Sequence, residues 1–241
     1  MAQSAYTCCP KQLILRLPYS QKSFIPLYHE CYNSINRKGY MDFRNENKRF
    51  DYIHSSKLTK ARLFADRFDD NVLSILPNEG SYLELGAGGG DYSKWLLDRK
   101  KFNVSYLLDF FNEPCARYGR WTAENHEQYV KNLLKDKNVM TVAGNIDSTI
   151  KTLDQKFDYI YVDAAHDYES VYSYLVESNK IINDGGVIGI NDYTFWGWFE
   201  QQEYECVEAV NKFLNTHSDW SVVGYALGYC GYSDIYIKKD A

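Results

Sequence analysis

The chain has 241 residues and a mass of 28.1 kDa, which suits one α/β domain with additions and is short for two full domains. Its formal net charge of -5 and its pI near 5.6 argue against a nucleic-acid partner, because phosphate binding depends on clustered lysine and arginine. No apolar run approaches the length that crosses a membrane, and the 6 cysteines show no metal-binding spacing. We therefore expect a cytoplasmic protein with free thiols and no membrane partner.

The N-terminal part of the chain contains short apolar runs interrupted by prolines, followed by a polar stretch. We interpret residues 1–54 as an N-terminal extension, with a lid role over the ligand site as a hypothesis from position alone, and residues 55–241 as the main domain. From Ser55 to Leu76, apolar residues recur at helical spacing, which predicts a helix over this range. Pro77 breaks the pattern ahead of the first strand.

The stretch that follows combines an apolar strand, a glycine-rich turn and an amphipathic helix. Residues 82–91 read Tyr-Leu-Glu-Leu-Gly-Ala-Gly-Gly-Gly-Asp, and a helical pattern continues over residues 92–97. This order is typical of a nucleotide-type binding loop in an open α/β sheet. A dinucleotide fingerprint would need glycine where Asp91 stands, whereas the pattern E-x-G-x-G-x-G, starting at Glu84, fits. Carboxylates beside a helix start disfavour a pyrophosphate and favour a ligand that carries positive charge.

Two further strand ends carry polar side chains that could meet the same ligand. Residues 102–108 read as the second strand, and Asp109 at its end lies about 20 residues past the glycines, where an open α/β fold places a carboxylate on ribose hydroxyls. Residues 139–142 read as the third strand and are followed by Asn145 and Asp147. Asp147 could instead cap the helix that follows, and the sequence does not decide between these roles.

The fourth and fifth strands are expected over residues 157–162 and 187–190. The polar residues that follow these two strands are Asp163, His166, Asn191 and Asp192. Because the carboxyl ends of parallel strands meet at one edge of a sheet, we expect these side chains to gather there. The acids and the amide offer hard oxygen donors, which suit Mg²⁺ or Ca²⁺ better than zinc.

The last part of the chain predicts a helix over residues 198–216 and a closing antiparallel hairpin made of residues 221–226 and 233–238. Five βα units followed by a hairpin resemble the class I AdoMet-dependent methyltransferases over about residues 55–240. That resemblance implies an α/β fold with a Rossmann-like, seven-stranded, mostly parallel sheet, helices on both faces and a C-terminal antiparallel hairpin.

The glycine stretch itself is similar to motif I of that family, which implies S-adenosyl-L-methionine (AdoMet) as the cofactor. On this resemblance the glycines let the methionine part pass close to the backbone, and Glu84 reaches its ammonium group directly or through water. Either Asn145 or Asp147 meets the adenine amino group. The cofactor-binding residues implied are Glu84, Gly86, Ala87, Gly88, Gly90, Tyr92, Asp109, Asn145, Asp147 and Asp163.

The strand-end acids resemble those of the metal-dependent O-methyltransferases of the catechol, caffeoyl-CoA and macrocin kinds. Residues 185–193 and Trp196 are most similar to the macrocin group, which methylates a sugar hydroxyl. The ligands implied for Mg²⁺, or for another divalent cation, are Asp163, Asn191 and Asp192. The Asn-Asp order departs from the usual Asp-Asp or Asp-Asn of these enzymes. A bound cation would acidify an acceptor hydroxyl, and His166, which stands where the catechol enzymes have a lysine, would accept its proton.

The expected function is AdoMet-dependent transfer of a methyl group to a hydroxyl of a small molecule, with His166 and Asp163 as catalytic residues. The acceptors implied are a sugar, a glycosylated natural product or a catechol-like diol. One alternative is a metal-independent methyltransferase in which these two residues act alone, and another is a non-catalytic AdoMet-binding protein. A nucleic-acid enzyme is disfavoured, because the N/D-P-P-Y motif of amino-methylating enzymes is missing after the fourth strand. The sequence leaves a homo-oligomer open.

Overall fold

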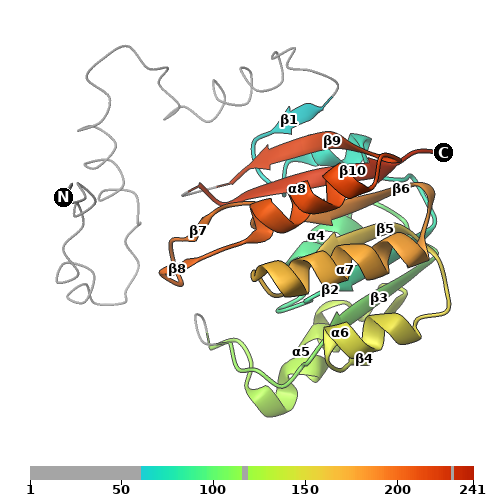
Figure 1. The fold of residues 1–241 in the computed structure, drawn as a ribbon. Coiled ribbons are helices and arrows are strands. Elements are labelled where there is room, and N and C mark those ends of the chain that lie inside the picture. Colours follow the sequence, from blue (N-terminus) through green and yellow to red (C-terminus); the bar gives the residue numbers. More distant parts are fainter. Residues whose placement is uncertain (1–60, 116–118, 229–230) are drawn as a thin grey trace, which may run out of the picture. The chain divides into compact units, whose positions relative to one another are not determined.

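A computed structural model of the chain describes residues 61–115, 119–228 and 231–241 (Figure 1). The predicted N-terminal extension, residues 1–54, and its lid role lie outside the described residues, and so does the beginning of the helix predicted from Ser55.

The described residues form one mixed sheet of eight strands, in the order β1-β9-β10-β6-β5-β2-β3-β4. Its strands are β1 (Arg62–Phe64), β2 (Ser81–Leu85), β3 (Val104–Asp109), β4 (Val139–Ala143), β5 (Phe157–Val162), β6 (Ile182–Ile190), β9 (Trp220–Leu227) and β10 (Ser233–Lys239). Only β10 runs antiparallel to its neighbours, β6 and β9, within this sheet. The mostly parallel sheet with a closing antiparallel hairpin is therefore confirmed, but the predicted number of seven strands is wrong, because β1 adds an eighth strand beside β9.

The helix predicted up to Leu76 is absent from the part of that range that the structure describes, which instead holds β1 and the 3-10 helix η1 (Asp70–Ser74). The cause is local competition for backbone groups by aspartate side chains. Asp66 Oδ1 accepts the N–H of Phe68 at 2.8 Å, and Asp69 caps η1 by accepting the N–H of Asn71 at 3.0 Å. The apolar residues of the pattern are still buried in part, but through a strand and a short turn of helix rather than one long helix.

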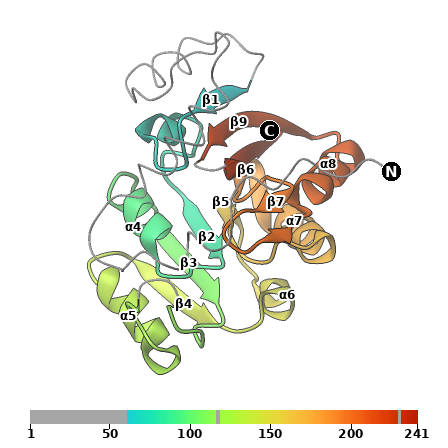
Figure 2. The same cartoon turned by 90° about the vertical axis from the view of Figure 1, so that its left-hand side faces the viewer.

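Helices cover both faces of the sheet (Figure 2). They are α4 (Asp91–Leu97), α5 (His126–Leu133), α6 (Ile146–Thr149), α7 (Tyr168–Ile181) and α8 (Cys206–Thr216), with the short 3-10 helices η2 (Ala123–Asn125) and η3 (Ile150–Thr152). One buried apolar cluster packs α4 and α5 against the sheet, and the other packs α6, α7 and α8 against the opposite face. Among the described residues, none of the helices has the length and apolar character of a membrane span.

The segment before α8 differs from the prediction of a helix starting at residue 198. Strands β7 (Trp196–Gly197) and β8 (Gln202–Glu203) pair as a separate antiparallel hairpin, and α8 begins only at Cys206. Gly197 permits this arrangement, because a Cβ atom there would lie 2.5 Å from the ring of Tyr204. The hairpin turns through Gln201, which has a positive φ of 56°. It projects from the sheet near the loops that follow β5 and β6, which carry the candidate site (Figure 1).

Candidate functional site

The glycine loop runs from the end of β2 to the start of α4 and needs glycine for two separate reasons. Gly86, Gly88 and Gly90 all have positive φ angles, of 86°, 47° and 74°, which L side chains rarely adopt. In addition, a Cβ atom on Gly86 would lie 1.9 Å from the carbonyl oxygen of Asp163, so the loop passes directly against the end of β5. A Cβ atom on Gly88 would meet nothing within 4 Å, so this part of the loop borders open space.

A cavity of about 450 Å³ opens beside this loop at the carboxyl ends of β2, β3 and β5. The predicted cofactor residues that line it are Glu84, Gly86, Ala87, Gly88, Tyr92, Asp109 and Asp163. Gly90, Asn145 and Asp147 are not among its lining residues. The Asn145 side chain instead accepts the N–H of Ser148 at 3.1 Å and caps α6, so Asn145 rather than Asp147 is the capping residue.

Glu84 lies at the bottom of the cavity with 1% of its surface exposed. Its Oε2 accepts hydrogen bonds from the hydroxyl of Tyr82, at 3.0 Å, and from the hydroxyl of Ser93. Burial raises the pKa of Glu84 to about 8, and the two hydroxyl donors only partly oppose this. A positively charged group that entered the cavity would favour the ionised carboxylate.

Asp109 joins the end of β3 to the glycine loop. Its Oδ2 accepts the N–H of Gly88 at 2.8 Å, and its Oδ1 accepts the N–H of Phe111 at 3.1 Å. Phe110, which stands between Asp109 and Phe111 in the chain, lines the cavity, and 45% of its surface is exposed. Our sequence analysis missed Phe110 and Ile146, another lining residue, although each is an apolar residue directly beside a predicted polar site residue.

Arg67 is a further lining residue that the sequence analysis missed, because it lies in the segment predicted as a helix. Its Nη1 donates to Asp163 Oδ2 at 2.9 Å and to the Tyr161 hydroxyl at 3.3 Å. The Tyr161 hydroxyl in turn donates to the buried carboxylate of Asp234. Burial raises the pKa of Asp163, and the Arg67 guanidinium opposes that rise. Asp163 therefore already has a cationic partner within the protein.

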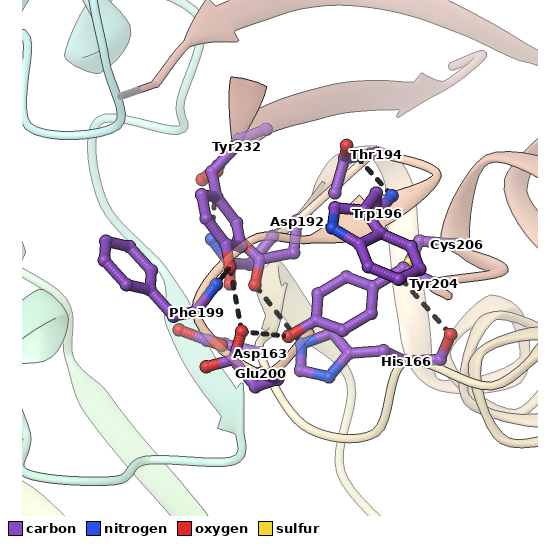
Figure 3. Close-up of polar contacts among 12 residues, drawn as sticks. Asp163, His166, Asp192, Thr194, Trp196, Phe199, Glu200, Tyr204, Cys206 and Tyr232 are labelled. Carbon is purple, nitrogen blue, oxygen red and sulfur yellow. Dashed lines mark hydrogen bonds and ion pairs between the residues drawn. The ribbon is translucent and has the colours of Figure 1, made fainter. Parts of the chain in front are cut away.

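His166 and Asp192 come together from the loops after β5 and β6 (Figure 3). His166 Nε2 lies 3.3 Å from Asp192 Oδ2, and its ring stacks on Tyr204 with 4.0 Å between ring centroids. The Tyr204 hydroxyl donates to Glu200 at 3.0 Å, and the Tyr232 hydroxyl donates to the same carboxylate oxygen at 2.8 Å. The His166 ring is thus held by Asp192 and Tyr204, and the Tyr204 ring by His166 and Glu200, which fixes the orientation of the imidazole.

The three side chains predicted to bind a divalent cation are each engaged elsewhere. Asp163 pairs with Arg67, Asp192 pairs with His166, and the Asn191 amide donates to Asp234 Oδ1 at 3.0 Å. Within residues 61–115, 119–228 and 231–241, no group of three or more histidine, cysteine or acidic side chains is arranged to hold a metal ion. A cation on Asp163 would also lie beside a guanidinium, which repels it. The predicted metal centre therefore does not fit this arrangement of side chains.

Comparisons with known proteins agree with the arrangement of the strands. Residues 83–193 match the model of a family described as a methyltransferase domain. An O-methyltransferase from Bacillus cereus, solved with SAH, is similar in structure, with a TM-score of 0.54 and 16% identity over 88% of this chain and 97% of that one. The O-methyltransferase TomG from Streptomyces achromogenes, involved in tomaymycin synthesis and solved with SAM, gives a TM-score of 0.51 and 18% identity over 70% and 77%.

An rRNA methylase from Streptococcus thermophilus is also similar, with a TM-score of 0.51 and 10% identity over 71% of this chain and 93% of that one. No curated protein matches the sequence. Identities this low show the fold alone, which these enzymes share although their names indicate different acceptors. The described residues therefore have the fold of methyltransferases, and residues 83–193 match a methyltransferase domain.

Proposed function

We propose that the protein is a methyltransferase that uses AdoMet to methylate a hydroxyl group of a small molecule, without a metal ion, and that His166 accepts the hydroxyl proton. The observation that carries the proposal is the His166–Asp192 pair, which is close enough to act electrostatically on Asp163, a lining residue of the cavity beside the glycine loop. The complexes of the Bacillus cereus enzyme with SAH and of TomG with SAM support AdoMet as the cofactor. The net charge of -5 favours a small acceptor over a nucleic acid.

The residues of the cavity provide candidate partners for the ammonium group, the ribose and the adenine ring of AdoMet. Glu84 is the candidate for the ammonium group, because a buried carboxyl gains most from a nearby cation. Asp109 is the candidate for the ribose hydroxyls, and Phe110 and Ile146 offer apolar surface to the adenine ring. Since the Asn145 oxygen already accepts from Ser148, Asp147 remains the candidate for the adenine amino group.

The chemistry that AdoMet supplies when bound is an electrophilic methyl group on a sulfonium. The task of the protein is to remove a proton from a weak nucleophile as that nucleophile attacks. Nε2 of His166 faces a carboxylate and carries a proton in the neutral ring, which leaves the lone pair on Nδ1 for the acceptor hydroxyl. Asp192 then stabilises the imidazolium, so that the pair acts as base and orienting group.

The Mg²⁺ predicted from the sequence is not part of this proposal, because the two carboxylates that would hold the ion are already engaged, Asp163 by the Arg67 guanidinium and Asp192 by the His166 ring. A metal-independent reaction, one of the alternatives from the sequence, is therefore preferred, but with Asp192 rather than Asp163 as the partner of His166. Its acceptors are the same as those expected above, a sugar, a glycosylated natural product or a catechol-like diol. Tyr204 stacks on His166, and Tyr232 and then Phe199 continue this row of aromatic rings, which suits the flat face of such an acceptor.

The test is methyl transfer from AdoMet to a panel of sugars and catechols, followed by mass spectrometry, with and without EDTA. Positioned general bases contribute roughly 10²- to 10⁴-fold, so His166→Gln should lower kcat by about a hundredfold or more at unchanged AdoMet affinity. Asp192→Asn should lower kcat and shift the pH–rate profile. His217→Gln is the matched control, because that histidine bonds to the carbonyl of Phe213. Activity that EDTA abolishes and Mg²⁺ restores would contradict the metal-independent mechanism.

A further inference from the structure

The cavity beside the glycine loop has an unequal balance of charged side chains. Its acidic lining residues are Glu84, Asp91, Asp109, Glu113 and Asp163. Arg67 is the one basic residue among the described residues that line it. Positive groups of a ligand in this cavity could pair with any of these acids, but a negative group could pair only with Arg67 among the described lining residues.

Arg67 is held so that part of its guanidinium remains for a ligand. Nη1 is fixed by Asp163 Oδ2 at 2.9 Å and by the Tyr161 hydroxyl at 3.3 Å, and the guanidinium also lies over the ring of Phe68, 5.1 Å from its centroid. A guanidinium has five N–H donors in a planar fork. In the described part of the chain, the hydrogen bonds of Arg67 use Nη1 alone, so the Nε and Nη2 edge of the fork is available.

The side chain is also in the right place relative to Glu84. Arg67 and Glu84 both line the cavity, and they lie close enough for the guanidinium to lower the pKa of the Glu84 carboxyl against the larger effect of burial. A carboxyl and a guanidinium on one wall form complementary partners for an ammonium and a carboxylate that are joined through one carbon atom. The free end of an α-amino acid has this arrangement.

Resting on the proposed function, we infer that Arg67 binds the α-carboxylate of the methionine part of AdoMet through its Nε and Nη2 edge, while Glu84 binds the α-ammonium. Arginine forks match carboxylates with two parallel hydrogen bonds, which gives selectivity as well as affinity. Asp163 holds the guanidinium in orientation from its other side. Without Arg67, the ligand carboxylate would face an acidic wall and would be repelled.

The experiment compares ligands that differ only at this group. Binding of AdoMet, of decarboxylated AdoMet and of 5′-methylthioadenosine is measured by calorimetry for the wild type, Arg67→Gln, Arg67→Lys and Arg99→Gln. Arg99 is the matched control, because it also pairs with an aspartate, Asp70, but does not line the cavity. Loss of hydrogen bonds to a charged group predicts about 10- to 100-fold weaker AdoMet binding in Arg67→Gln. Binding of the other two ligands should change by less than about threefold.

Arg67→Lys keeps the charge and loses the fork, so we expect an intermediate loss that is again specific for AdoMet. If Arg67→Gln does not fold, the ratio of affinities for AdoMet and decarboxylated AdoMet in Arg67→Lys provides the test. Equal loss for all ligands would show that Arg67 only supports the structure, and unchanged AdoMet affinity would show that it does not bind the carboxylate. Either result overturns the inference. A wild type that binds neither AdoMet nor methylthioadenosine would instead overturn the proposed function.

Discussion

Two glycines of the same loop provide a sharp test of the site, because their surroundings differ. Gly86 and Gly88 both have positive φ angles, but a Cβ atom would lie 1.9 Å from the Asp163 carbonyl oxygen at Gly86 and would meet nothing within 4 Å at Gly88. Alanine at Gly86 should therefore damage the fold. Alanine at Gly88 should leave the fold nearly intact and place a methyl group in the space where the ligand passes.

The magnitudes follow from the backbone and the contact. An alanine held in the left-handed region costs roughly 1–2 kcal/mol, which applies to both variants. In Gly86→Ala the Asp163 backbone must also move, and its N–H donates to the Leu85 carbonyl at 2.8 Å. Losing that hydrogen bond and the packing around it adds about 1 kcal/mol or more, for a total of about 2–3 kcal/mol or more. At about 2–4 °C per kcal/mol for a domain of this size, Tm should fall by about 2–8 °C in Gly88→Ala and by about 4–12 °C or more in Gly86→Ala.

The assay is thermal unfolding followed by circular dichroism, together with AdoMet titration of each variant below its Tm. We expect Gly88→Ala to be the more stable variant and still to bind AdoMet at least about tenfold more weakly than the wild type. A Gly86→Ala protein that melts within about 2 °C of the wild type would refute the close contact with Asp163. Wild-type AdoMet affinity in Gly88→Ala would refute the position of the ligand beside the loop.

Two further predictions concern the acids of the cavity. Because the folded pKa of Glu84 is about 8, the folded state holds a proton that the unfolded state releases near pH 4.5. The free energy of unfolding should therefore fall as pH rises from about 4.5 to 8. Urea unfolding at pH 5, 7 and 9 should show a shallower decline of this free energy in Glu84→Gln than in the wild type. Asp109→Ala removes the acceptor of the Gly88 and Phe111 N–H groups, so calorimetry should show AdoMet binding weakened by about tenfold or more. The control is Asp184→Ala, which changes an exposed acid outside the cavity and should bind AdoMet like the wild type.

The sequence was most informative where one segment determined its own structure. The apolar run at residues 157–162 and the glycine turn after β2 contain their own signals, the first through continuous burial and the second through φ angles that only glycine adopts freely. β1 carried no such signal. It has three residues, its apolar spacing also fits a helix, and the aspartates that stop the helix act through hydrogen bonds to nearby N–H groups.

The strand-end acids were found from the sequence, but their partners were not. Asp163 and Asp192 follow neighbouring parallel strands, so their proximity follows from topology. Whether they share a metal ion or each pair with another side chain of the protein depends on where Arg67 and His166 lie. Arg67 comes from a segment about a hundred residues earlier in the chain, as the separation of 96 positions from Asp163 shows. No local pattern encodes a contact of that range.

The Arg67–Asp163 pair and the His166–Asp192 pair divide the site into parts that can be changed separately. Arg67 and Asp163 line the cavity beside the glycine loop, whereas His166 and Asp192, which we propose act on the acceptor, are not among its lining residues. A shared metal ion would connect these parts, because its removal would alter acceptor binding, hydroxyl acidity and the cofactor wall together. In the arrangement observed here, variants of Arg67 should change AdoMet affinity and leave the pH–rate profile in place. Variants of His166 should change the profile and leave AdoMet affinity in place, so that the two sets of measurements separate cofactor binding from proton removal.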